Sequence, residues 1–193
     1  MKLFFAFLLL SFVPVAMAKD AAPIEITADT ALEWDRDAST FIARGNATAT
    51  QGKTSITSEK LTADYTEKGE GLTIKKIVAK GGNPIVKTEN ETLKATIITA
   101  YFSNGGKTEL EKIIAEKNVT IETKTQTLTG DHAEYYPAKQ KATVTGNVKI
   151  IDGKNILTGD RADFDMKTNT STLKSGQSSG RVRAVFFSGG DTQ

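Results

Sequence analysis

The sequence predicts an all-β protein of repeated units that stack into two facing antiparallel sheets. Three observations predict it: a short phrase recurs along the chain, apolar residues alternate between its copies, and the alternation changes phase inside each unit. One unit of this size cannot bury its apolar face alone and must stack on its neighbours. The molecule is therefore expected to be elongated.

The recurring phrase begins with Asn, usually after Gly, and returns at intervals of 37, 35 and 29 residues. Each Asn is followed 15 or 17 residues later by Ala and an acidic or aromatic pair. The copies begin at Asn46, Asn83, Asn118 and Asn147, and their alanines are Ala63, Ala100, Ala133 and Ala162. The unit therefore stretches at its turns and keeps its core length.

Strands are predicted between the Gly and Asn residues, where Thr, Val and Ile are concentrated. Ile24 and Ile26 flank a charged residue, and the same alternation occurs in Val119-Thr-Ile121 and Val148-Lys-Ile150. Side chains two residues apart share one face of a strand. One face of each sheet is therefore expected to be apolar and the other wet.

The alternation changes phase inside a unit. Leu93 and Ala95 are in step, whereas Ile98, Ala100 and Phe102 are in step with one another on the other parity. A phase change with no intervening proline predicts a bulge or corner at which the strand passes from one sheet to the facing one.

Segment 108–117 contains good helix formers, but the corresponding segment 73–82 is rich in β-branched residues and ends in two glycines. The repeat therefore predicts a strand at both. Turn-forming residues predict loops at 67–71, 103–106, 152–154 and 166–169.

Residues 1–18 are predicted to be a signal peptide, with Lys2, an apolar run and an Ala-x-Ala site cleaved after Ala18. The alternative is an uncleaved membrane anchor. The chain contains 0 Cys, which excludes a lipid-anchored lipoprotein and disulfides. We expect one domain over residues 19–187 and a flexible tail at 188–193.

The composition and motifs do not favour catalysis or nucleic-acid binding. The 25 basic and 23 acidic residues nearly cancel, and no basic stripe is present. His132 is the single His and occupies a position filled by Thr30, Thr62, Thr99 and Arg161 in the other units, so it is a generic polar site rather than a general base. No enzyme and no cofactor are expected.

Acidic residues recur before and after the motif alanines. They are Asp29, Asp131 and Asp160, and Asp64, Glu134 and Asp163. Calcium is one interpretation, but the residues lie among Lys and Arg and lack calcium-repeat spacing, so charged cross-strand partners are favoured.

Several stretches resemble one family of exported proteins. Residues 22–29, 45–52, 56–64, 157–162 and 181–185 resemble the organic-solvent-tolerance (OstA-like) family of periplasmic lipopolysaccharide-transport proteins. The resemblance covers roughly Pro23 to Phe187. It implies a twisted β-jellyroll whose two antiparallel sheets open in a V-shaped section. Lys117 departs from the family, which usually has Gly there.

The resemblance also implies a function in the periplasm of a Gram-negative cell. Such proteins join end to end into a bridge between an inner-membrane-anchored component and the outer-membrane translocon. We expect a head-to-tail homo-oligomer in which the edge strands Pro23–Thr27 and Arg181–Phe187 pair.

The expected cargo is lipopolysaccharide, held by its lipid A acyl chains in an internal groove. Each CH₂ exposed to water costs about 0.8 kcal/mol, so bare transfer is unfavourable. The small motif alanines are expected to leave room between the sheets, and Lys and Arg at the lip to meet the phosphates. The expected lipid-binding residues are Ile24, Ile26, Leu32, Trp34, Phe41, Val119, Ile121, Val148, Ile150 and Phe164.

Three alternatives stay open at this stage. The chain could be an inner-membrane-anchored relative with the same fold, or a structural β-solenoid that binds no lipid. A carbohydrate-active enzyme would need a pair of acids unmatched by the other units. Trp34 could contact a ligand, although packing is the simpler role.

Overall fold

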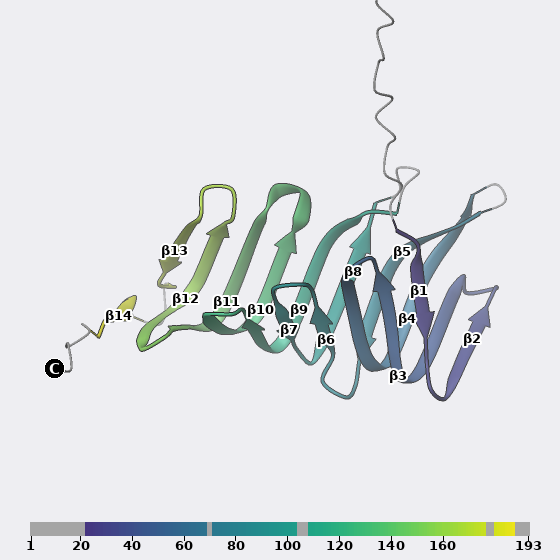
Figure 1. Cartoon of the computed structure of the whole chain (residues 1–193), viewed down its shortest axis with the longest axis horizontal. Helices are drawn as coiled ribbons and strands as arrows, with labels where there is room; N and C mark the ends of the chain where they lie inside the picture. Colours follow the sequence, from purple (N-terminus) through teal and green to yellow (C-terminus); the bar gives the residue numbers. More distant parts are fainter. Residues whose placement is uncertain (1–21, 69–70, 104–107, 177–179, 188–193) are drawn as a thin grey trace, which may run out of the picture.

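The computed structural model describes residues 22–68, 71–103, 108–176 and 180–187 (Figure 1). The predicted signal peptide and tail, and parts of the loops predicted at 67–71 and 103–106, lie outside the described residues. Among the residues that it describes, no helix is long and apolar enough to cross a membrane.

The described chain is almost entirely β-structure. Its strands are β1 (Ile24–Thr27), β2 (Ala31–Asp35), β3 (Thr40–Gln51), β4 (Thr54–Lys68), β5 (Gly71–Lys80), β6 (Ile85–Lys87), β7 (Thr92–Lys94), β8 (Ile97–Phe102), β9 (Leu110–Glu122), β10 (Gln126–Tyr136), β11 (Lys141–Asp152), β12 (Asn155–Asp165), β13 (Thr170–Lys174) and β14 (Arg183–Val185). A 3-10 turn, η1 (Pro137–Lys139), joins β10 to β11.

These strands form one antiparallel hydrogen-bonded sheet that is folded lengthwise into two layers. The long strands β3, β4, β9, β10, β11 and β12 run through both layers. β10 and β11 keep the same two neighbours in both layers, whereas β3, β4, β9 and β12 keep one neighbour and change the other at the fold line. Layer A runs β1-β3-β4-β6-β7-β9-β10-β11-β12-β14. Layer B runs β2-β3-β4-β5-β8-β9-β10-β11-β12-β13. The prediction of two facing antiparallel sheets fed by every unit is confirmed.

The molecule is elongated, with β2 near one end and β14 at the other (Figure 1). The segments with mixed helix and strand signals are both strands, β5 and β9, as the repeat predicts. Burial changes phase inside β4 as well: Ile56 and Ser58 are buried before the fold line, and Leu61 and Ala63 after it.

The fold line between the layers passes through the recurring Asn residues. Gly45-Asn46 and Gly146-Asn147 have φ values of 78° and 41°, and 79° and 48°. At each pair the long strand carries two residues opposite one on its neighbour, and the pairing register shifts there. Two consecutive left-handed residues thus form the bulge that turns the strand from one layer into the other.

Lys117-Asn118 has the same backbone conformation, with φ values of 62° and 52°. The departure at Lys117 therefore leaves the corner intact and places a residue with a Cβ where glycine is preferred.

The Asn side chains fasten the corner to a neighbouring segment, which is the link between β1 and β2 at Asn46 and strand β10 at Asn147. Asn46 Nδ2 donates to Asp29 Oδ2 at 2.8 Å and Asn147 Nδ2 donates to Asp131 Oδ2 at 2.8 Å. The interpretation of Asp29 and Asp131 as charged cross-strand partners is therefore wrong, because their carboxylates accept hydrogen bonds from the corner amides.

Two of the three acids after the motif alanines, Asp64 and Asp163, form cross-strand pairs on the outer face of layer B. The third, Glu134, contacts His132 and Tyr136 of its own strand. Asp64 Oδ2 lies 2.7 Å from Lys76 Nζ. Asp163 accepts hydrogen bonds from Arg161, Lys174 and Thr143. These bonds, that from Arg161 most of all, hold the pKa of Asp163 well below its ordinary value.

Gly146→Ala should destabilise the fold more than Gly153→Ala. Both glycines have positive φ, but a Cβ at Gly146 would lie 2.7 Å from the Asp131 Cβ, whereas one at Gly153 meets nothing within 4 Å. Gly153→Ala should cost about 1 kcal/mol from backbone strain, or about 2–4 °C in Tm. Gly146→Ala should cost roughly 2–4 kcal/mol because the close approach adds to the strain. Equal decreases in Tm for the two variants would contradict the close approach of Gly146 to Asp131.

Asp163→Asn should weaken the dependence of the melting temperature on pH in the acid range. The folded pKa of Asp163 is depressed, so its contribution is present above the unfolded pKa of about 3.9 and is lost as pH falls through the folded value. At pH 7 the variant should melt roughly 2–4 °C below the wild type, with the gap closing below about pH 4. Asp152→Asn is the matched control, since Asp152 accepts from a neutral amide. A difference in Tm between variant and wild type that stays constant with pH would refute a stabilising role for the ionised Asp163 carboxylate.

Candidate functional site

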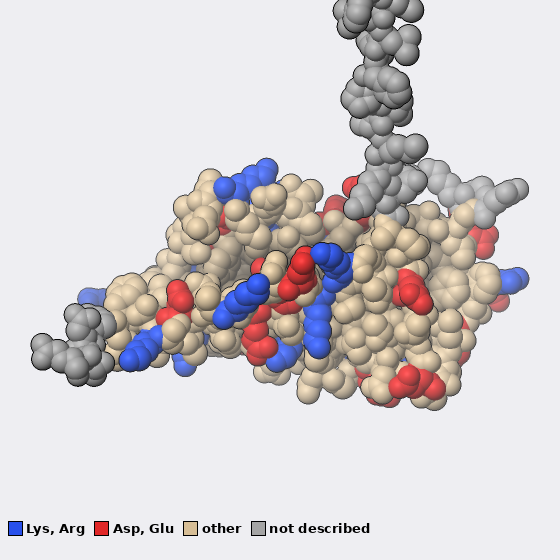
Figure 2. Space-filling view, in the orientation of Figure 1, with Lys and Arg blue, Asp and Glu red and all other residues tan. Residues whose placement is uncertain are grey.

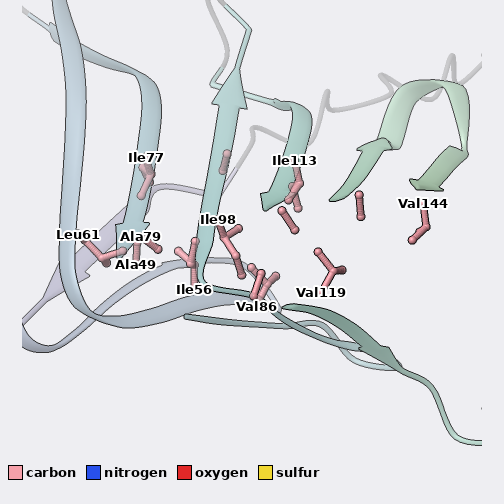
Figure 3. Close-up of a cluster of buried hydrophobic side chains, with 14 of the residues drawn as sticks. Ala49, Ile56, Leu61, Ile77, Ala79, Val86, Ile98, Ile113, Val119 and Val144 are labelled. Atoms are coloured by element: carbon pink, nitrogen blue, oxygen red, sulfur yellow. The ribbon is translucent and has the colours of Figure 1, made fainter. Parts of the chain in front are cut away.

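Between the layers, the corner side is tightly packed. The least exposed side chains there include Ala47, Ala79, Ala115 and Ala162, each at 0% exposure. Of the motif alanines, expected to leave room between the sheets, Ala63, Ala133 and Ala162 are buried in the core beside the corner, whereas Ala100 lines a cleft of about 110 Å³. Their small size lets the two layers approach each other where they meet. Figure 3 shows buried apolar side chains between the strands, among them Ala79, Val119 and Val144.

A cleft of about 490 Å³ lies between the layers over the C-terminal half of the molecule. Apolar side chains from both layers line it. Layer A contributes Val86, Leu93, Ile121, Leu128 and Ile150, and layer B contributes Leu110, Ile113, Tyr135, Ala142 and Phe164. This C-terminal cleft is of the size of an ordinary small-ligand site.

A second cleft of about 110 Å³ lies under the N-terminal strands. Its lining includes Ile24, Ile56, Ile77, Phe102 and Gln51. The two clefts share Thr54, Val86, Leu110 and Ile113, so they adjoin. The described interior therefore holds a narrow N-terminal cleft that continues into a wider C-terminal one.

Four of the ten residues expected to bind lipid line the clefts. Ile121, Ile150 and Phe164 line the C-terminal cleft, and Ile24 lines the N-terminal cleft. Ile26 packs against the core from β1.

Val119 and Val148 are each 1% exposed, follow the corner Asn directly and line neither cleft. A charge at Val148 is therefore expected to disrupt the core rather than to block a ligand, and lipid contact by these two valines stays a prediction.

Leu32, Trp34 and Phe41 lie together at the N-terminal end of layer B. Leu32 and Trp34 pair with Ala43 and Phe41, so they share the inner face. Trp34 is 48% exposed, and its ring centroid lies 5.1 Å from that of Phe41. Its Nε1 donates a hydrogen bond to the Tyr65 hydroxyl at 2.8 Å. Packing is therefore one role of Trp34, and a ligand contact stays a prediction.

Sequence reasoning missed several cleft residues. Leu110 and Ile113 lie in the segment with helix-like composition, and a register shift between them places both on the inner face although they have opposite parity. Leu128 faces both Ile121 and Ile150 across neighbouring strands. The register of the hairpin between β9 and β10 would have identified Leu128.

The lip of the C-terminal cleft is polar and carries acids. Glu91 and Asp165 are the charged residues of its lining, and Lys141 Nζ lies 3.3 Å from Asp165 Oδ2. Burial, and then the charge of Glu91, raise the pKa of Tyr135. The expected Lys and Arg therefore do not line this lip.

On the face shown in Figure 2, Lys and Arg alternate with Asp and Glu and form no patch of one sign. Within the described ranges, no group of three or more His, Asp or Glu side chains is placed to hold a metal ion. His132 faces outward and its Nε2 lies 3.3 Å from Glu134 Oε1.

Residues 25–170 match the family model of the LptA/(LptD N-terminal domain) LPS transport protein. The chain belongs to this family.

One solved structure with a similar chain is LptH of Pseudomonas aeruginosa, described as the LptA-homologous periplasmic component of the lipopolysaccharide transport device. The identity is 16%, the match covers 86% of this chain and 96% of that chain, and the TM-score is 0.35. At these values the match adds no argument to the fold described above. A comparison with curated protein sequences found no significant match.

Proposed function

We propose that this member of the LPS-transport family carries lipopolysaccharide through the periplasm with its acyl chains between the two layers. The C-terminal cleft is the observation that carries the proposal. Its apolar walls come from both layers, and its lip is polar. Sheltering ten CH₂ groups there would offset roughly 8 kcal/mol of exposure to water.

The two ends of the molecule support end-to-end assembly. Among the described strands, β1 and β14 pair on one side only, as do β2 and β13, so each layer has an open edge at each end. Open edges pair readily with a further strand. Exposed apolar side chains lie beside these edges, with Leu32 at 57% exposure and Phe186 at 71%.

In this proposal, copies of the chain join head to tail and extend the groove. An inner-membrane-anchored component and the outer-membrane translocon would occupy the two ends of such a bridge. Cleavage after Ala18 would release the chain into the periplasm, and N-terminal sequencing that finds Lys19 first would distinguish it from a membrane-anchored relative.

Ile150→Arg should reduce the lipopolysaccharide that copurifies with the protein by about tenfold or more, because it places a charge on the cleft wall. Ile151→Arg is the matched control on the opposite face of the same strand. The measurement is mass spectrometry of extracted lipid A, with circular dichroism to verify the fold. Ile150 is only 8% exposed, so a charge there also strains the fold. A second variant, Ile121→Arg, therefore places the charge at a half-buried position of the same cleft.

Equal lipid in all three folded variants would overturn the internal groove. A wild-type protein without lipid would instead favour a purely structural β-solenoid.

Removal of residues 23–27 or 181–187 should abolish concentration-dependent oligomers in sedimentation velocity. Each deletion removes an edge strand of layer A, so the next copy loses its pairing partner. Removal of residues 188–193 is the control and should leave the oligomers unchanged. Oligomers that persist in a folded β1 or β14 deletion would show that edge pairing is the wrong mechanism.

A further inference from the structure

One polar side chain crosses the opening between the layers. Gln51 ends the layer A half of β3, and its Nε2 donates to the Thr108 carbonyl at 2.8 Å, just before β9 in layer B. The same Nε2 donates to the Ala22 carbonyl at 3.0 Å, just before β1. The amide thus uses both of its hydrogens, one toward each layer.

Gln51 lies on the inner face of layer A. It has the same parity as Ala47 and Ala49, which are 0% and 4% exposed, and it pairs with Ile24, which lines the same cleft. Its side chain therefore bridges the two layers at the opening of the N-terminal cleft, on the side away from the corner.

The equivalent positions of the other units do not span the opening. Five residues after each corner Asn stand Gln51, Thr88, Thr123 and Asp152. The hydroxyls of Thr88 and Thr123 accept from backbone N–H groups of their own turns, and Asp152 accepts from Gln126 in the same layer. These shorter side chains lie along the C-terminal half, where the cleft is wide.

We infer that Gln51 is a latch across the lip of the N-terminal cleft, whereas the corresponding lip residues of the other units bond within their own layer. The inference rests on the proposed lipid function. An acyl chain enters the C-terminal cleft without breaking a bond between the layers. From the lip, it reaches the N-terminal cleft only when the Gln51–Thr108 hydrogen bond opens. Because Gln51 also holds Ala22, the latch lies beside β1, the edge at which a neighbouring copy would dock.

The test is photocrosslinking to purified hexa-acylated lipid A, with p-benzoylphenylalanine replacing either Ile24 or Phe164. Both residues are half-buried, and they line the N-terminal and the C-terminal cleft respectively. With Gln51 present, crosslinking should be strong at position 164 and weak at position 24. Gln51→Ala should raise the ratio of position 24 to position 164 about 2- to 10-fold, the population change expected for one ordinary hydrogen bond.

Gln126→Ala is the matched control, because Gln126 is also a lip glutamine of layer A but bonds within its own layer. It should leave the ratio unchanged. Gln51→Glu keeps the length of the side chain and removes its donors, so it should open the latch as Gln51→Ala does. Joining the double variant Gln51→Cys/Thr108→Cys with a short bis-maleimide should suppress crosslinking at position 24.

The outcomes separate the two proposals. Equal crosslinking at both positions before any change at Gln51, or a ratio unaffected by both Gln51 variants, overturns the latch and leaves lipid carriage standing. Absence of crosslinking at both positions overturns lipid carriage, and the latch falls with it.

Discussion

The whole architecture depends on a corner made by two consecutive left-handed residues. At Gly45-Asn46 and Gly146-Asn147 the chain turns from one layer to the other without ending its strand. The backbone hydrogen bonds therefore continue on both sides of the fold line, and one sheet supplies two facing walls. The Asn amide then fixes the corner to the neighbouring segment of the chain through Asp29 or Asp131. Glycine suits the first position because a Cβ there would meet that neighbour.

A fold with its corner on one side only has a natural opening on the other. Alanines beside the corner let the layers meet closely, and larger side chains further from it face each other across a wider gap. An apolar interior that is not filled by its own side chains is unfavourable in water unless a ligand or a partner covers it. In this molecule the open side is apolar in its walls and polar at its lip, which is the distribution that a lipid with a polar head requires.

The sequence was sufficient to predict the two-layer architecture, because its signals are local. The phase change near Leu93 and Ile98 indicates a corner regardless of what packs around it. The repeat of the Asn residues predicted a strand at residues 108–117 in spite of their helix-like composition. The role of each apolar residue was harder to predict. Val148 and Ile150 have the same parity on one strand, yet Val148 lies in the core and Ile150 lines the cleft. Distance from the corner decides between those roles, and it follows from the three-dimensional register rather than from alternation.

The same dependence on distance accounts for the difference between the two halves of the groove. Three residues after the corner Asn, the inner face of layer A carries Ala49 in the first unit, then Val86, Ile121 and Ile150. Larger side chains hold the facing layer further away, because protein interiors pack to a nearly constant density. Where Ala49 stands, the layers come close enough for Gln51 to reach the Thr108 carbonyl. Where Ile121 and Ile150 stand, the layers lie apart and the lip residues turn back to their own layer. The gradient in side-chain size along one face thus sets both the width of the cleft and the place at which a latch between the layers is possible.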